Sequence, residues 1–181
     1  MTLTVTRTRR RLVRLETPAR LDTLARDEFE GYASLFGVAD GAGDVVAKGA
    51  FAASLRRIPP ARVRLLYQHF AHEPIGVWEE IREDGRGLYV RGRLIESVTR
   101  AREVMALIRE GALDGLSIGF RTVRASRDSA SRLRTLREIE LWEISIVTFP
   151  LLKESGVTAV GGTDPLAAHI RKATQRINQE I

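Results

Sequence analysis

The strongest constraint on the fold is a β-hairpin signal in the middle of the sequence. Residues 75–82 (IGVWEEIR) and 88–94 (LYVRGRL) are strand candidates, and residues 83–87 (EDGRG) between them are typical of a tight turn. Further strands are predicted at 29–38, with a bulge or kink, at 63–68 and 116–123, and at 141–149 within the segment 136–149. The chain is therefore predicted to be mainly β with some α-helix (α+β).

Two internal helices are predicted from apolar residues at helical spacing. Residues 50–58 have an i, i+4, i+7 pattern and stop at a Pro-Pro pair, and residues 99–110 carry an apolar face with Gly111 placed as a C-cap. The apolar faces consist of Phe51, Leu55 and Ile58 in the first helix, and of Ala101, Val104, Met105 and Ile108 in the second.

The last two predicted strands have polar residues at informative positions. Alternation places Ser117 and Gly119 on the face of residues 116–123 opposite to its apolar side chains. In the later strand, Trp142 is predicted to share a face with two isoleucines, while Glu143 lies on the other face. The polar segment 125–134 between these strands lacks periodicity and is predicted to be a mobile loop.

Composition excludes several kinds of chemistry. The 181 residues contain no cysteine, which removes disulfides, thiolate metal sites and cysteine nucleophiles. The three histidines are His69, His72 and His169, so we expect neither a zinc site nor any other metal site, and no motif indicates a cofactor. The sequence has no apolar run of membrane-spanning length and no apolar stretch after its basic N-terminus, so we expect a soluble, intracellular protein.

The net charge of +6 permits a nucleic-acid or acidic partner. All but Lys48, Lys153 and Lys172 of the 29 basic residues are arginine, a bias that a GC-rich genome also produces. Basic residues interleave with acidic ones over most of the chain, and aromatic residues make up only 6%. We therefore do not expect nucleic acid to be a specific partner.

The search for a nucleophile is limited to hydroxyl groups, which need a base and a group to orient that base. His69 follows a predicted strand, Ser117 lies between apolar neighbours, and Glu143 lies in an otherwise apolar strand. Each has a plainer interpretation: a structural histidine, a small packing residue and a carboxylate on a solvated face. The residues alone therefore give only a weak hydrolase hypothesis.

Five segments, taken in order along the chain, carry a resemblance to a known family. They are GYASLFGVADGAGDVVAKGAF (31–51), LLYQHFAHEPIGVWEE (65–80), GLYVRGRL (87–94), EVMALIREGALDGLSIGF (103–120) and LWEISIVTFP (141–150). With them the chain resembles the prohead protease family of tailed bacteriophages, particularly the branch of gene transfer agents. That family is distantly similar to the herpesvirus assemblins. The resemblance implies a closed antiparallel β-barrel with a few surrounding helices and a serine–histidine mechanism.

The resemblance also implies roles for single residues. The family's histidine before Pro-Ile-Gly falls on His69, its serine before Ile-Gly-Phe on Ser117, and its acidic residue in the last core strand on Glu143. Many members have aspartate directly after the histidine, where this chain has Phe70, and His72 is interpreted as a solvated loop residue. The expected division is an N-terminal arm at 1–27, the protease barrel at 28–160 and a helical tail at 161–181.

The function that the resemblance implies is that of a serine endopeptidase of capsid maturation. Its substrates would be the N-terminal scaffolding region of the major capsid protein and the protease itself, inside the assembling prohead in the bacterial cytoplasm. Self-association of the chain is a further expectation. The alternatives are a catalytically inactive internal scaffold of the prohead and, from another class, a basic nucleic-acid-binding barrel.

Overall fold

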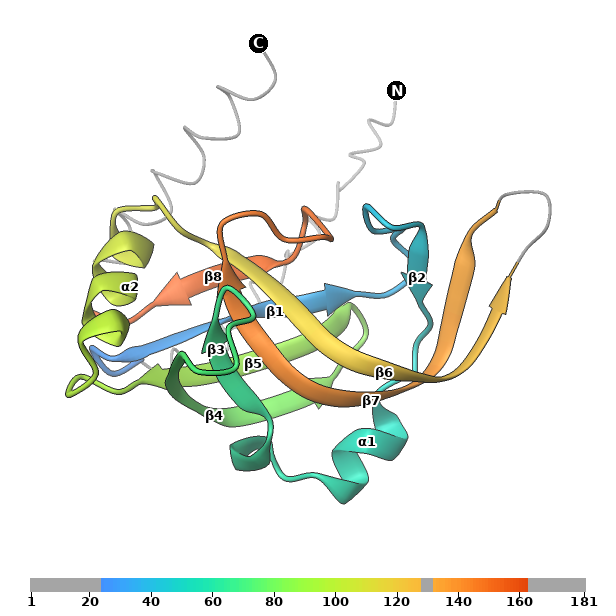
Figure 1. Cartoon of the computed structure of the whole chain (residues 1–181), viewed down its shortest axis with the longest axis horizontal. Helices are drawn as coiled ribbons and strands as arrows, with labels where there is room; N and C mark the ends of the chain where they lie inside the picture. Colours follow the sequence, from blue (N-terminus) through green and yellow to red (C-terminus); the bar gives the residue numbers. More distant parts are fainter. Residues whose placement is uncertain (1–23, 128–131, 163–181) are drawn as a thin grey trace, which may run out of the picture.

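The computed structural model describes residues 24–127 and 132–162. In chain order the elements are β1 (Glu28–Leu35), β2 (Asp44–Val46), α1 (Ala52–Arg57), a single 3-10 turn (Pro60–Arg62), β3 (Arg64–Tyr67), β4 (Pro74–Glu83), β5 (Gly87–Leu94), α2 (Thr99–Arg109), β6 (Gly115–Arg127), β7 (Arg134–Val147) and β8 (Gly156–Val160). Both helices lie at the outside of the strands (Figure 1).

Seven of the strands close into a barrel in the order β7-β3-β4-β5-β1-β8-β6, and β6 pairs back to β7. Neighbours in this ring are antiparallel except β3 and β7, which run parallel. The short β2 lies outside the ring and pairs in parallel with the first residues of β7. The expected mainly β fold with a closed barrel is confirmed. The parallel pairing of β3 with β7 was not predicted from the sequence.

The barrel interior is filled by the inward-facing side chains of every strand. Trp78 of β4 and Phe29 of β1 are almost fully buried and meet edge to face, with ring centroids 5.5 Å apart. Burying one such large apolar side chain contributes about 1.5–3 kcal/mol. The apolar faces predicted for the helices also pack on this core, with Phe51 at the start of α1 and Val104 in α2 fully buried.

The predicted faces of β7 are wrong at one position. Trp142 is 55% exposed, and its neighbour Leu141 takes the place in the core at 1% exposure. The cause is a β-bulge: Gly119 of β6 pairs with Glu143, whereas the next residue of β6 pairs with Leu141. Because the bulge adds one residue to β7, simple alternation places Trp142 in the core instead of Leu141.

The predicted mobile loop at 125–134 is also wrong in part. Strand β6 continues to Arg127 and β7 begins at Arg134, and only 128–131 fall outside the described residues. The far ends of β6 and β7 leave the barrel as a two-stranded ribbon (Figure 1). The predictions for residues 1–23 and for the helix in 163–181 lie outside the described residues.

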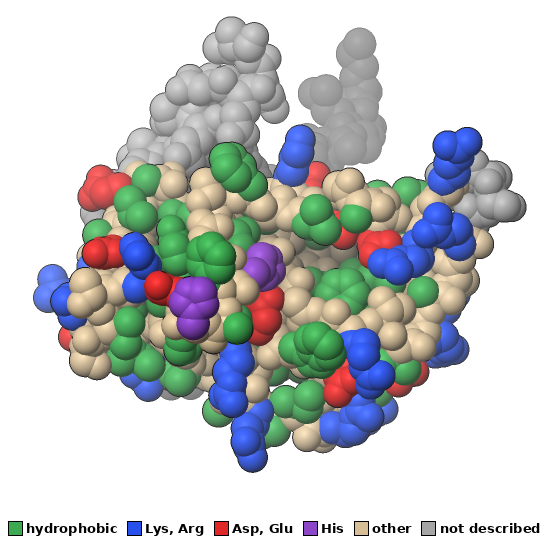
Figure 2. Space-filling view, in the orientation of Figure 1, with side chains coloured by type: hydrophobic (Ala, Val, Ile, Leu, Met, Phe, Trp, Pro, Cys, Tyr) green, Lys and Arg blue, Asp and Glu red, His purple; other side chains and the backbone are tan. Residues whose placement is uncertain are grey.

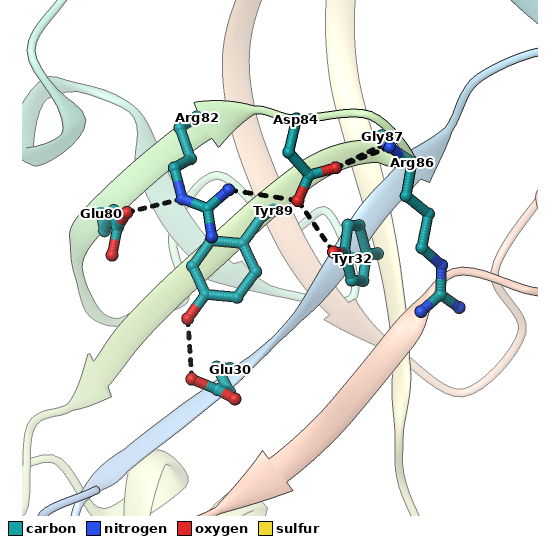
Figure 3. A network of polar contacts seen from close by, with 8 residues as sticks. All are labelled: Glu30, Tyr32, Glu80, Arg82, Asp84, Arg86, Gly87 and Tyr89. Atoms are coloured by element: carbon teal, nitrogen blue, oxygen red, sulfur yellow. Dashed lines mark hydrogen bonds and ion pairs between the residues drawn. The ribbon is translucent and has the colours of Figure 1, made fainter. Parts of the chain in front are cut away.

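A polar network covers the outer face of β1, β4 and β5 around Asp84 (Figure 3). Asp84 accepts hydrogen bonds from the backbone N–H groups of Arg86 and Gly87 at 2.8 and 3.1 Å. The same carboxylate accepts one from the Tyr32 hydroxyl at 2.8 Å and one from the Arg82 guanidinium at 3.1 Å. The network therefore ties the tip of the β4–β5 hairpin to β1.

Candidate active site

The candidate site lies on the outward faces of β6 and β7. In their antiparallel register Ser117 is opposite Ser145, and Gly119 is opposite Glu143. Directly opposite residues have neighbouring side chains on the same face of a sheet. Two of the three predicted site residues, Ser117 and Glu143, therefore share one face, diagonally related across the strand pair.

The third predicted residue, His69, reaches this face from the turn after β3. Strand β3 runs parallel beside β7, with Tyr67 opposite Ile146, so its end arrives next to the end of β7. The turn places Gln68 and His69 in the left-handed region, with φ of 52° and 60°. This backbone conformation is uncommon for residues other than glycine and needs support from its surroundings.

Strand β7 and Thr148, the residue after it, supply that support through four hydrogen bonds, the longest of them from the Thr148 N–H to Gln68 Oε1 at 3.4 Å. The Gln68 N–H donates to the Ile146 carbonyl at 3.0 Å, and the Gln68 side-chain amide donates to the Thr148 hydroxyl at 2.7 Å. The His69 N–H donates to the Ser145 hydroxyl oxygen at 3.1 Å. The turn is therefore fixed to the strand that carries Glu143.

His69 and Glu143 form a direct pair, with 2.7 Å between His69 Nδ1 and Glu143 Oε1. An ionised carboxylate only accepts hydrogen bonds, so Nδ1 carries the proton and, in the neutral ring, Nε2 is the free base. The hydrogen bond to Glu143 raises the pKa of His69, burial opposes this rise, and the charge of Glu143 adds to it. The histidine side chain is 44% exposed and the glutamate 14%, so the ring remains open to a substrate.

Ser117 is half-buried beside this pair. Within the described part of the chain, no hydrogen bond joins the Ser117 hydroxyl to the His69 ring. The structure thus brings His69 and Glu143 into contact and places Ser117 on the same face without a direct bond to either. Catalytic hydrogen bonds are often loose in structures without substrate.

A shallow apolar surface surrounds the pair. A groove of about 420 Å³ is lined by Leu66, Ala71, Pro74 and Trp142 together with Arg64 and Glu143. Phe70, which directly follows His69, is 50% exposed and stacks on the exposed His72 with ring centroids 5.6 Å apart. Figure 2 shows this face, with the two described histidines among hydrophobic and acidic side chains.

Ser145 is a site residue that the sequence did not single out. Its side chain is fully buried, and its hydroxyl donates to Glu143 Oε2 at 2.6 Å. A signal was present, because residues two apart in a strand share a face and Ser145 follows Glu143 by two. Among the described residues no group of histidine and acidic side chains is arranged to hold a metal ion, and no helix is long and apolar enough to cross a membrane.

The fold and the site together define a closed β-barrel protein that carries a histidine–carboxylate pair beside a serine on its outer surface. The family model of the caudovirus prohead serine proteases matches residues 14–165, and the chain belongs to this family.

Individual relatives agree with this assignment. The prohead protease of Enterobacteria phage HK97 is 35% identical over 138 residues, which are 75% of this chain and 61% of that protein. The prohead protease of Escherichia phage T5 is 32% identical over 91 residues, or 50% of this chain and 42% of that protein. The chain thus spans about three fifths or less of these relatives. Among solved structures, the capsid assembly protease of bacteriophage T4 has a TM-score of 0.55 at 18% identity, covering 68% of this chain and 82% of that one, which shows a shared fold.

Proposed function

We propose that this chain is a serine endopeptidase in which Ser117 is the nucleophile, His69 the general base and Glu143 the residue that orients the histidine. The observation that carries the proposal is the His69–Glu143 pair, at 2.7 Å, on the same barrel face as Ser117 in a member of a serine protease family. Glu143 is held by the barrel rather than by a loop, which suits a residue that must keep an imidazole in one orientation.

In the proposed reaction, neutral His69 takes the proton of Ser117 through Nε2 as the serine oxygen attacks the scissile carbonyl carbon. The charged imidazole is stabilised by Glu143, and it then gives its proton to the leaving amine, which frees the new N-terminus and leaves an acyl group on Ser117. Water, activated by the same histidine, releases the acyl group. The raised pKa of His69 means that the base stays protonated to a higher pH, so the cleavage rate should rise with pH across that pKa.

The proposed substrates are the N-terminal scaffolding region of the major capsid protein and the protease itself, and the site of action is the assembling prohead in the bacterial cytoplasm. Support comes from relatives described as prohead proteases. The half-exposed histidine and the shallow groove beside it also suit an extended segment of a protein more than a small enclosed molecule. Self-association of the chain remains part of the proposal.

The deciding experiment is Ser117→Ala in the full chain, co-expressed with the major capsid protein. Cleavage, followed by gel and by mass spectrometry of the new termini, should fall by several orders of magnitude, roughly 10⁶ in a well-studied serine protease. Folding should survive, because one hydroxyl is lost from a half-buried position. Ser126→Ala is the matched control, since Ser126 lies on the exposed ribbon and bonds Arg137, and this variant should process normally.

Other outcomes separate the alternatives. Processing by Ser117→Ala at a rate near wild type would remove Ser117 as the nucleophile. A wild-type protein that enters proheads but cleaves neither itself nor the capsid protein would favour the inactive scaffold. Affinity for DNA with a steep dependence on salt and a preference for particular sequences would favour the nucleic-acid-binding barrel.

A further inference from the structure

We infer that Ser145 is a positioning residue of the active site, whose single hydroxyl holds both the Glu143 carboxylate and the His69 turn. The inference rests on the proposed function, because it assigns Ser145 a part in the same reaction. Ser145 neither touches the substrate nor forms a bond to it. It acts through His69 and Glu143.

The hydroxyl of Ser145 has two hydrogen bonds with opposite roles. It donates its proton to Glu143 Oε2 at 2.6 Å, and its oxygen accepts the His69 N–H at 3.1 Å. The two oxygens of Glu143 are thereby divided, since Oε1 meets His69 Nδ1 at 2.7 Å. One buried side chain thus closes a loop of contacts that runs from the histidine backbone through the carboxylate and back to the histidine ring.

Burial makes this arrangement hard to replace. Ser145 is 0% exposed, so water cannot take over its donor or its acceptor role. Without the hydroxyl, Glu143 loses the contact that fixes one of its oxygens. The backbone N–H of His69, a residue in the left-handed region, loses the oxygen that accepts its hydrogen bond. Both changes loosen the His69–Glu143 pair.

The same observations separate Ser145 from the proposed nucleophile. The Ser145 hydroxyl already donates its hydrogen bond to the Glu143 carboxylate, and its side chain has no exposed surface. A scissile carbonyl group therefore cannot reach it. Ser117 lies across the strand pair from it, half-buried and open to the surface. One serine is placed to react and the other to hold the base.

The test is Ser145→Ala in the full chain, with Ser54→Ala as a matched control. Ser54 is 1% exposed and its hydroxyl accepts the N–H of Leu141 in the same strand β7 at 3.0 Å. Both variants remove a buried hydroxyl that serves a backbone N–H, so both should lose similar stability. Only Ser145→Ala also removes a contact to the His69–Glu143 pair.

The first readout is the NMR titration of His69, whose signals are assigned by comparison with His69→Gln. In Ser145→Ala the pKa of His69 should fall toward its ordinary value, because the raised pKa depends on the contact with Glu143. Of the other ionisable side chains nearby, His72 is exposed and Glu73 is paired with Arg100 at 3.5 Å, so neither supplies this rise. Ser54→Ala should leave the His69 pKa unchanged.

The second readout is cleavage. Ser145→Ala should lower kcat by about 100-fold, the effect of a small misplacement of catalytic groups, with little change in KM. The acid side of its pH–rate profile should move to lower pH together with the His69 pKa. Ser145→Thr, which keeps the hydroxyl, should recover much of the rate. If Ser145→Ala fails to fold, Ser145→Cys keeps the volume but offers only a weak donor, and it should show the same changes in smaller measure.

Clear results would overturn the inference. These are a His69 pKa in Ser145→Ala that matches that of Ser54→Ala, a pKa that rises, or an unchanged kcat. A failure of the proposed function looks different, because the wild-type chain would then cleave nothing. In that case the titrations of the two serine variants still decide whether Ser145 holds the pair.

Discussion

The missing side chain of Gly119 is as important to the site as the side chains that are present. A Cβ built at Gly119 would lie 2.0 Å from Glu143 Oε1, the atom that meets His69. The carboxylate lies over the strand in space that any other residue would fill. A glycine opposite Glu143 in the β6–β7 register is therefore a condition for the His69–Glu143 contact.

This gives a prediction for Gly119→Ala. The methyl group should force the Glu143 carboxylate away from His69, so cleavage should fall by about 10- to 100-fold, because misplacement of a catalytic group by an ångström can cost that much. Rates on a capsid-protein substrate measure the effect. Gly85→Ala is the control, since nothing lies within 4 Å of a Cβ at Gly85. Equal rates for the two variants would contradict the importance assigned to this close approach.

How far the sequence predicted the site depends on the residue. His69, Ser117 and Glu143 were named through motifs that resemble a family, and two of them meet directly. Ser145 was missed although its spacing places it on the same face as Glu143, because spacing alone does not distinguish a packing serine from one that bridges two polar groups. Its role depends on the turn after β3, which only the tertiary structure places beside β7.

At the scale of single elements, the β4–β5 hairpin depends on Asp84 at its tip. Burial would raise the pKa of Asp84, but the hydrogen bonds from the Arg86 N–H, the Tyr32 hydroxyl and the Gly87 N–H outweigh it and lower the pKa. A carboxyl with a lowered folded-state pKa stabilises the fold above its unfolded-state pKa. That contribution is lost as the pH falls through the folded-state pKa.

Asp84→Asn should therefore lower the free energy of unfolding by about 1–2 kcal/mol at pH 7, because charged hydrogen bonds in a partly exposed place are replaced by neutral ones. The difference between wild type and variant should shrink below about pH 4, where the Asp84 carboxyl of the unfolded wild-type chain begins to gain its proton while the folded one stays ionised. Urea unfolding at several pH values measures it. Glu154→Gln, on an exposed residue, should cost little at any pH. A difference for Asp84→Asn that does not change with pH would count against the network.

Elements with a strong local signal were predicted, and those that depend on partners were not. The hairpin and α2 were found because turn residues and helical spacing act over a few neighbours. Strands β2 and β8 have only three and five residues. Each is stabilised by pairing with a strand distant in the sequence, β2 with β7 and β8 with β1. The exposed face of Trp142 was missed for a similar reason, since a bulge is a property of two strands together.

At the scale of the whole molecule, β8 and the glycine after it close the barrel. Strand β8 pairs with β1, and a single pair of residues, Gly115 and Gly156, joins it to β6. Gly161 is buried and donates its N–H to the Glu28 carbonyl at 2.8 Å, and a Cβ there would lie 1.6 Å from the Ala25 carbonyl oxygen. Close contacts with the barrel domain therefore continue to Gly161, the first residue of the tail predicted at 161–181.

Two truncations test where the barrel ends. The chain 1–162 keeps β8 and its contacts, so its Tm should stay within about 3 °C of the full chain, a change of roughly 1 kcal/mol for a domain of this size. The chain 1–155 lacks β8, which leaves the edges of β1 and β6 unpaired, so it should be insoluble or melt far lower. If residues 163–181 serve an intermolecular contact, the chain 1–162 should also associate less with itself in light scattering or enter proheads less efficiently. A chain 1–162 that is insoluble or melts many degrees lower would instead place residues 163–181 in the domain's own core, and the intermolecular role would then be wrong.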